Sequence, residues 1–93
     1  MNIAQTILSQ IKTLDPRALW AWGAKDLVNI GEGLQFKTSG MVKNKCYVTV
    51  KLNASDLYDV EFFKLRTGKM ITLSTAADVF AEDLVGVIDR VVQ

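Results

Sequence analysis

The chain has 93 residues, of which 49% are hydrophobic and 23% are charged, and its formal net charge is +1. A chain of this length organises a single hydrophobic core, so we expect one domain over residues 1–93. The apolar content excludes a disordered chain. The near-zero net charge argues against a strongly basic nucleic-acid binder and against an acidic DNA mimic.

The only cysteine, Cys46, cannot form an internal disulfide, as expected for a protein of a reducing compartment. The N-terminal sequence has no signal-peptide pattern, and no apolar stretch approaches the roughly 20 residues that cross a bilayer. We therefore expect a cytoplasmic protein without a membrane segment.

The first predicted element is an amphipathic helix over about residues 2–14. Its apolar residues recur at intervals of three or four: Ile3, Ile7, Ile11 and Leu14. Asn2 is a candidate N-cap, and Asp15-Pro16 should end the helix, because the residue before a proline is disfavoured in helical conformation.

Residues 17–23 follow, with Trp20 and Trp22 alternating with small residues. This alternation favours a strand with both indoles on one face. The next stretch, Ala24–Ile30, is interpreted as a helical turn before the turn signal of residues 31–33.

Four strands are then predicted, over about residues 34–37, 45–53, 59–67 and 70–75, from apolar and polar residues that alternate. The apolar phase slips at Phe62-Phe63, which indicates a β-bulge or a strand covered on both sides. Gly68-Lys69 is the predicted hairpin turn between the last two strands.

A helix closes the chain, with an apolar stripe formed by Phe80, Leu84, Val87, Ile88 and Val91. Thr75 and Asp78 have the spacing of a capping box, which predicts a helix start near Asp78. The expected fold is α+β: an antiparallel sheet of three to five strands, flanked by an N-terminal and a C-terminal helix packed on one face.

The residue types that most enzymes need are missing. The chain has no histidine, one cysteine and no Walker A motif, which removes the commonest general base and the usual zinc ligands. We expect a non-enzymatic protein with no cofactor and no catalytic or metal site. One alternative is a divalent cation at Asp59 and Glu61, which are two apart on one strand; surface acids that pair with Lys51 or Lys64 are favoured instead.

Two groups of residues are candidates for binding a partner. Lys37, Lys51, Lys64 and Arg66 are spread over different predicted strands, and Lys37 and Lys51 should share a solvent face with Tyr47. Bases around an aromatic ring suit single-stranded nucleic acid, although an ordinary soluble sheet face explains them as well.

The second group is Trp20 and Trp22. An exposed tryptophan would be an interface anchor, whereas a small core would use their bulk. A homodimer is a further expectation, formed through an exposed strand edge or through these two indoles. Cys46, on an apolar strand face, is interpreted as a core residue.

Three stretches resemble a group of small uncharacterised proteins of phages, prophages and other mobile elements. They are the opening TILSQI, the segment 23–27 (GAKDL), and YVTVKLN at 47–53 running into DLYDVEF at 56–62. The resemblance implies an accessory protein that binds a host or phage macromolecule, for instance a host defence component. The alternative is a nucleic-acid-binding module that uses the Lys37/Tyr47/Lys51 face.

Overall fold

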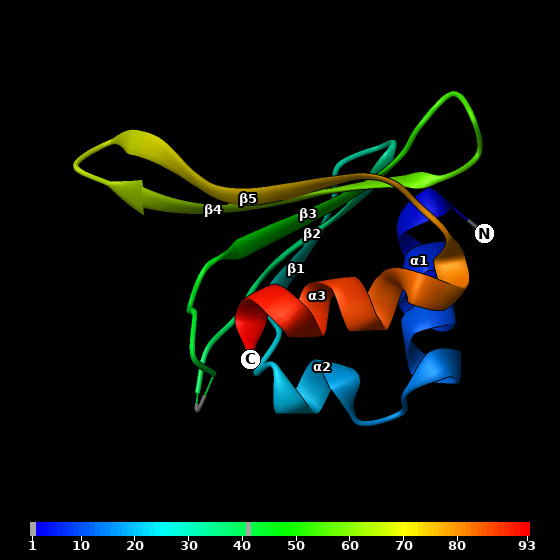
Figure 1. The fold of residues 1–93 in the computed structure, drawn as a ribbon, viewed down its shortest axis with the longest axis horizontal. Coiled ribbons are helices and arrows are strands. Elements are labelled where there is room, and N and C mark those ends of the chain that lie inside the picture. The colour runs from blue at the N-terminus through cyan, green and yellow to red at the C-terminus, as the bar shows by residue number, and fades with distance from the viewer. Residues whose placement is uncertain (1, 41) are drawn as a thin grey trace.

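The computed structural model describes residues 2–40 and 42–93 (Figure 1). In chain order its helices and strands are α1 (Ile3–Leu14), α2 (Ala18–Ala21), β1 (Lys25–Asn29), β2 (Gly33–Lys37), β3 (Tyr47–Leu52), β4 (Tyr58–Arg66), β5 (Lys69–Val79), the 3-10 helix η1 (Ala81–Asp83) and α3 (Leu84–Val92).

The five strands form one sheet in the order β1-β2-β3-β4-β5, and every neighbouring pair is antiparallel. The three α-helices lie together on one side of it (Figure 1). The predicted α+β fold is therefore confirmed. The opposite side, called the open face below, is covered by no helix of the described residues.

The N-terminal helix begins and ends where the sequence predicts. Asn2 Oδ1 accepts the backbone N–H of Gln5 at 2.8 Å, and Gln5 Oε1 accepts the backbone N–H of Asn2 at 3.1 Å, which completes a capping box. The helix ends at Leu14, just before Asp15-Pro16. Its buried residues, Ala4, Ile7 and Ile11, lie on the face that packs against the sheet.

The tryptophan segment was predicted incorrectly. Residues 18–21 form the short helix α2, and the two indoles do not share a face: Trp22 is 0% exposed, whereas Trp20 is 84% exposed. Ala24–Ile30 is also not a helical turn, because Lys25–Asn29 form the edge strand β1. Both segments are too short for their own pattern to fix the structure, and contacts with the rest of the chain decide it.

The β4–β5 hairpin agrees with the prediction in its main features. The register of the two strands shifts between Phe62 and Phe63, but the extra residue, Leu73, lies in β5, and β4 pairs with β3 without a shift. The apolar phase slip of β4 instead reflects burial on both sides, with Phe62 0% and Phe63 8% exposed. The turn lies one residue earlier than expected, at Thr67-Gly68, whose φ angles of 48° and 76° fit a turn that matches the twist of the strands. The turn end of this hairpin reaches beyond the helices (Figure 1).

The C-terminal helix starts later than predicted. Asp78 does not cap it but lies in β5 with a φ of 54°, and its Oδ1 accepts a hydrogen bond from Asn53 Nδ2 at 2.8 Å. The buried residues of α3 are Leu84, Ile88 and Val92, and Phe80 of the expected stripe is 55% exposed. Asp78 and Val79 are in a strand and not in the helix because β5 continues its pairing with β4 as far as Val79.

The core lies between the sheet and the helices, and specific contacts lock its layers together. The rings of Trp22 and Phe36 stack with centroids 6.0 Å apart, and the Trp22 indole N–H donates to Asp89 Oδ1 of α3 at 2.9 Å. The Tyr58 hydroxyl of β4 donates to Gln10 Oε1 of α1 at 2.6 Å. Helices and sheet are thus joined by hydrogen bonds as well as by apolar packing.

Candidate interaction surfaces

The open face carries the basic and aromatic residues predicted to share a surface. Val48 and Val50 of β3 are in the core, so the residues that alternate with them, Tyr47, Thr49 and Lys51, point the other way. Lys37 of β2 pairs with Tyr47 across the ladder. The prediction that Lys37, Tyr47 and Lys51 share one face is confirmed.

An aromatic stack with a cation beside it forms one end of the open face. The rings of Tyr47 and Phe63 lie with centroids 5.2 Å apart and planes 11° from parallel. The ammonium nitrogen of Lys37 lies 5.6 Å from the centre of the Tyr47 ring, within cation–π range. Phe63 is only 8% exposed although no helix covers it, so the surrounding side chains of the face bury it.

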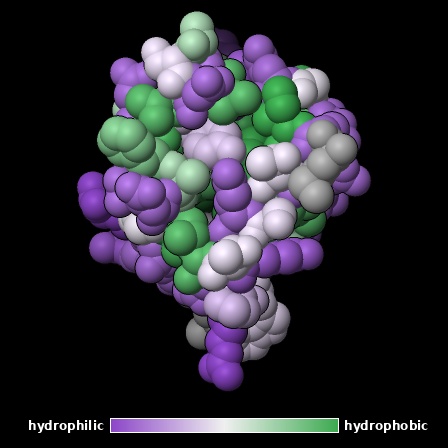
Figure 2. Space-filling model, turned by 90° about the vertical axis from the view of Figure 1, so that its right-hand side faces the viewer, coloured by the Kyte–Doolittle hydropathy of each residue, from purple (hydrophilic) through white to green (hydrophobic). Residues whose placement is uncertain are grey.

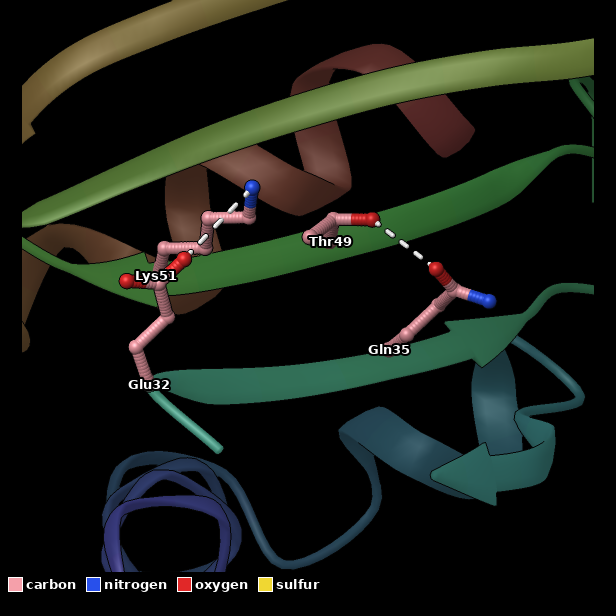
Figure 3. A network of polar contacts seen from close by, with 4 residues as sticks. All are labelled: Glu32, Gln35, Thr49 and Lys51. Atoms are coloured by element: carbon pink, nitrogen blue, oxygen red, sulfur yellow. Dashed lines mark hydrogen bonds and ion pairs between the residues drawn. The ribbon is translucent and has the colours of Figure 1, made fainter. Parts of the chain in front are cut away.

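A row of polar side chains continues from the stack along β2 and β3 (Figure 3). Thr49 Oγ1 donates to Gln35 Oε1 at 3.5 Å, and Lys51 Nζ lies 3.8 Å from Glu32 Oε1 in a solvent-exposed ion pair. Two shallow hollows of about 330 and 310 Å³ flank Thr49 and Lys51. Both contacts are long, and the Lys51 and Glu32 side chains are 50% and 64% exposed, so water also solvates this row.

The charges of the open face cancel. Lys51 stands opposite Asp59 on β4, and Thr49 stands opposite Glu61. Lys25 stands opposite Lys37 and adds a third base, so Lys25, Lys37 and Lys51 share the face with Asp59, Glu61 and Glu32, a balance of zero. The sequence favoured pairing of Asp59 and Glu61 with Lys51 or Lys64; Lys51 does stand opposite Asp59, but its ion pair is with Glu32. With the charges balanced, the phosphate attraction that nucleic-acid binding depends on is weak on this face.

The Asp59 carboxylate of β4 forms hydrogen bonds that connect β4 to β5. Its Oδ1 accepts the backbone N–H of Asp78 at 3.1 Å and the Asn53 side-chain N–H at 3.0 Å. These hydrogen bonds, that from the Asp78 backbone first, lower the pKa of the Asp59 carboxyl. Within residues 2–40 and 42–93, no group of three or more acidic, histidine or cysteine side chains is arranged to hold a metal ion.

A pH titration tests the stabilising role of these hydrogen bonds of Asp59. A carboxyl whose pKa is lower in the folded than in the unfolded chain stabilises the fold above its unfolded pKa, and this stabilisation is lost as the pH falls through the folded pKa. We expect Asp59→Asn to lower the melting temperature at pH 6, and the gap to the parent protein to narrow below about pH 4. Thermal melts of both proteins from pH 3 to 7 measure the difference in melting temperature. A difference that stays constant over this range would contradict the stabilising role of the Asp59 hydrogen bonds.

Lys64 and Arg66 do not join the basic residues of the open face. They alternate with Phe63 on β4 and so point to the helix side of the sheet, where the Lys64 charge acts on Cys46. Cys46 is 2% exposed, which confirms it as a core residue, and burial raises the pKa of its thiol against the opposing effects of the Thr38 hydrogen bond and of Lys64. The four bases therefore form no common binding strip.

Trp20 makes the most exposed apolar surface among the described residues. A hollow of about 420 Å³ adjoins it, lined also by Ala21, Gly23, Ser39, Gly40 and Gln93. The Ser39 hydroxyl donates to the Gly23 carbonyl at 2.7 Å, and the Gln93 amide donates to the Ala21 carbonyl at 3.3 Å. The hollow is thus built from three segments far apart in the sequence, which is why the sequence pattern missed it.

Smaller apolar groups emerge where α1 meets η1. Leu14 is 42% exposed and lines a hollow of about 290 Å³ between these helices, and Phe80 just before η1 is 55% exposed. Figure 2 faces this side and shows apolar side chains in separate groups among hydrophilic ones. Such scattered groups are ordinary for a small protein surface.

Comparisons with protein-family models, with curated proteins and with solved structures find no match to this chain. Among the described residues, no helix combines the length and the apolar character needed to cross a membrane. What the chain binds is therefore inferred from the chemistry of its surfaces.

Proposed function

We propose that this chain is a non-enzymatic accessory protein of a phage or mobile element, and that it acts in the cytoplasm by binding a protein partner through the surface around Trp20. A component of host defence is one specific form of that partner. The mobile-element origin comes from the sequence resemblance, and the non-enzymatic part comes from the missing histidine and nucleophile chemistry.

The observation that carries the proposal is the exposure of Trp20. Tryptophan is one of the residue types enriched among binding hot spots, together with tyrosine and arginine, and such residues become fully desolvated when the partner binds. Here 84% of Trp20 is exposed next to a hollow. Trp22, two residues later, anchors α2 to the core by its stacking on Phe36 and its hydrogen bond to Asp89, so the backbone that carries the exposed Trp20 indole is fixed.

Nucleic acid is the second candidate, favoured by the stack of Tyr47 on Phe63 with Lys37 beside it. Aromatic rings with nearby bases are what a single-stranded nucleic acid binds. The acids Asp59 and Glu61 on the same face oppose phosphate binding, and this charge balance places the candidate second.

Affinity capture from a lysate of the organism that carries the sequence tests the proposal. The parent protein, Trp20→Ala and Leu14→Ala are immobilised in parallel, and half of each lysate is treated with nuclease. We expect one protein to be enriched on the parent and on Leu14→Ala, and to bind Trp20→Ala about 30-fold more weakly, as for a hot-spot residue. Circular dichroism confirms that the variants are folded.

Equal capture by the parent protein and by Trp20→Ala, or no enriched protein at all, would overturn the Trp20 assignment. Nuclease-sensitive capture that is lost in Lys51→Glu and kept in Trp20→Ala would replace the proposal with the nucleic-acid candidate. Leu14 is the matched control because it is an exposed apolar side chain on a different surface.

A further inference from the structure

The turn end of the β4–β5 hairpin carries basic residues without acids beside them. Residues 64–71, called the arm below, form this end, and its turn reaches beyond the helices (Figure 1). The arm contains three bases, Lys64, Arg66 and Lys69, and no acid, so its formal charge is +3. Among the described residues the one ion pair joins Lys51 to Glu32 and involves none of these bases. The arm is therefore a strongly basic projection.

The three bases lie close together on one side of the arm. Arg66 stands opposite Lys69 across the hairpin, and Lys64 is two residues before Arg66 on β4. Direct cross-strand neighbours share a face, as do residues two apart on a strand. Arg66 and Lys69 are exposed and Lys64 is partly exposed. Like charges directly opposite one another destabilise a sheet, so the hairpin keeps an unfavourable arrangement that a bound anion would relieve.

The acids of the sheet lie away from the arm. The strand registers form one row across the sheet, which consists of Lys25, Lys37, Tyr47, Phe63 and Thr72. The arm lies on one side of this row. All acids of the five strands lie on the other side: Asp26, Asp59, Glu61 and Asp78.

This separation of charge exceeds the range over which the acids act. Arg66 and Glu61 are five residues apart on β4, which is about 17 Å at about 3.3 Å per residue. Salt at physiological concentration screens exposed charges over about 8 Å. The chain's net charge of +1 is therefore an average over a basic arm and an acidic remainder of the sheet, and it does not describe the arm.

We propose that the arm binds duplex DNA by entering its major groove, and that Lys64, Arg66 and Lys69 contact phosphates at the sides of the groove. The dimensions agree, because the strands of a ribbon are about 4.8 Å apart and the major groove of B-DNA, about 12 Å wide, admits a two-stranded ribbon. Lys64 and Arg66 are about 7 Å apart along one face, which is comparable with the separation of neighbouring phosphates on a DNA strand. The inference goes beyond the proposed function, because Trp20 on α2 takes no part in it.

The apolar side chains of the arm favour duplex DNA over a lipid surface. Leu65 and Met70 stand opposite each other on the open side and are each 55% exposed, whereas Ile71, 45% exposed, stands opposite Lys64 among the bases. An element that lies on a membrane keeps a broad apolar face apart from its basic face, and the arm does not. In a major groove, such side chains can contact thymine methyl groups.

The aromatic stack favours a duplex over a single strand. Single-stranded nucleic acid stacks its bases on exposed rings. Phe63 is only 8% exposed, so the stack with Tyr47 offers one accessible ring at most. The bases of the arm are the more accessible groups, and they suit contact with phosphates.

Fluorescence anisotropy of a short labelled DNA duplex tests the proposal, with the matching single strand and vesicles that contain anionic lipid in parallel. We expect the duplex to bind with a Kd of roughly 1–100 μM at physiological salt, as for sequence-independent binding. Three phosphate contacts predict that binding weakens about 40-fold between 50 and 200 mM salt.

Charge-neutral variants identify the surface. Lys64→Gln, Arg66→Gln and Lys69→Gln should each weaken duplex binding several-fold and lower the slope of log Kd against log salt by about one. Lys51→Gln is the matched control, because it removes the same charge from the same sheet on the acidic side of the row; it should leave affinity and slope unchanged. Arg66→Gln and Lys69→Gln should not lower the melting temperature, since each removes a repulsive pair.

Three outcomes would overturn the proposal. The first is no binding of the duplex at 50 mM salt, which would leave the protein partner of Trp20 unaffected. The second is equal loss of binding in Lys51→Gln and Arg66→Gln, which would exclude the arm as the site. The third is tighter binding of another probe: of the single strand, lost in Tyr47→Ala, which would place nucleic acid on the open face, or of the vesicles, which would identify a lipid surface.

Discussion

Replacing Trp22 with alanine should lower the free energy of unfolding by about 3–5 kcal/mol. The indole is 0% exposed, stacks on Phe36, and donates its N–H to Asp89 at 2.9 Å. The variant loses the buried apolar area, opens a cavity between α2 and the sheet, and leaves the Asp89 carboxylate without this donor. Urea unfolding followed by circular dichroism measures the change.

Trp20→Ala is the matched control, because the same substitution two residues away removes a side chain that is 84% exposed. Its unfolding free energy should stay within about 0.5 kcal/mol of the parent value. Trp22→Phe, which keeps most of the apolar volume and removes the indole N–H, should fall between the two alanine variants. Similar losses in Trp20→Ala and Trp22→Ala would show that the burial of these two residues is assigned wrongly.

The elements that could be predicted are those whose signal is local. The helix at residues 3–14 has an apolar period, a capping side chain at Asn2 and a terminating Asp15-Pro16, and all three agree with the structure. Strand β3 alternates without interruption, so the faces of Tyr47 and Lys51 followed from it. The phase slip at Phe62-Phe63 did not locate the bulge, because the extra residue, Leu73, lies in the partner strand β5.

The elements that could not be predicted depend on contacts between distant residues. Trp20 and Trp22 alternate with small residues over only four positions, and that spacing also fits one helical turn. In the structure the Trp22 indole stacks on Phe36 and donates to Asp89, 67 residues away, and such contacts are absent from the local pattern. Thr75 and Asp78 have capping-box spacing, but Asp78 is held in β5 by Asn53, 25 residues earlier in the chain.

The same distinction applies to the candidate surfaces. The alternation of apolar and polar residues predicted that Lys37 and Tyr47 would share a face, because side chains alternate between the two faces along each strand. It did not predict that Phe63 stacks on Tyr47, since that contact depends on the register between β3 and β4. The hollow beside Trp20 was equally hidden, because it needs Ser39 and Gln93 brought to α2 by the fold.

A second large loss of stability is expected for Gly33→Ala. Gly33 is buried at the start of β2, opposite Lys51 of β3. A Cβ added there would collide with the Val50 carbonyl oxygen and lie 2.9 Å from the Lys51 Cα. Both are backbone atoms of the central strand and cannot rotate away, so β2 and β3 must separate at this end, at a cost of about 3 kcal/mol.

Gly86→Ala provides the opposite result with the same chemical change. Gly86 lies exposed in α3, and a Cβ added there meets no atom within 4 Å. Alanine should stabilise the chain by about 0.5–1 kcal/mol, since glycine is a weak helix former. Thermal melts of both variants compare the two sites directly. If Gly33→Ala melted with the parent protein, β2 and β3 could not be as closely paired at Gly33 as the structure has them, and the assigned register of the open face would lose its support.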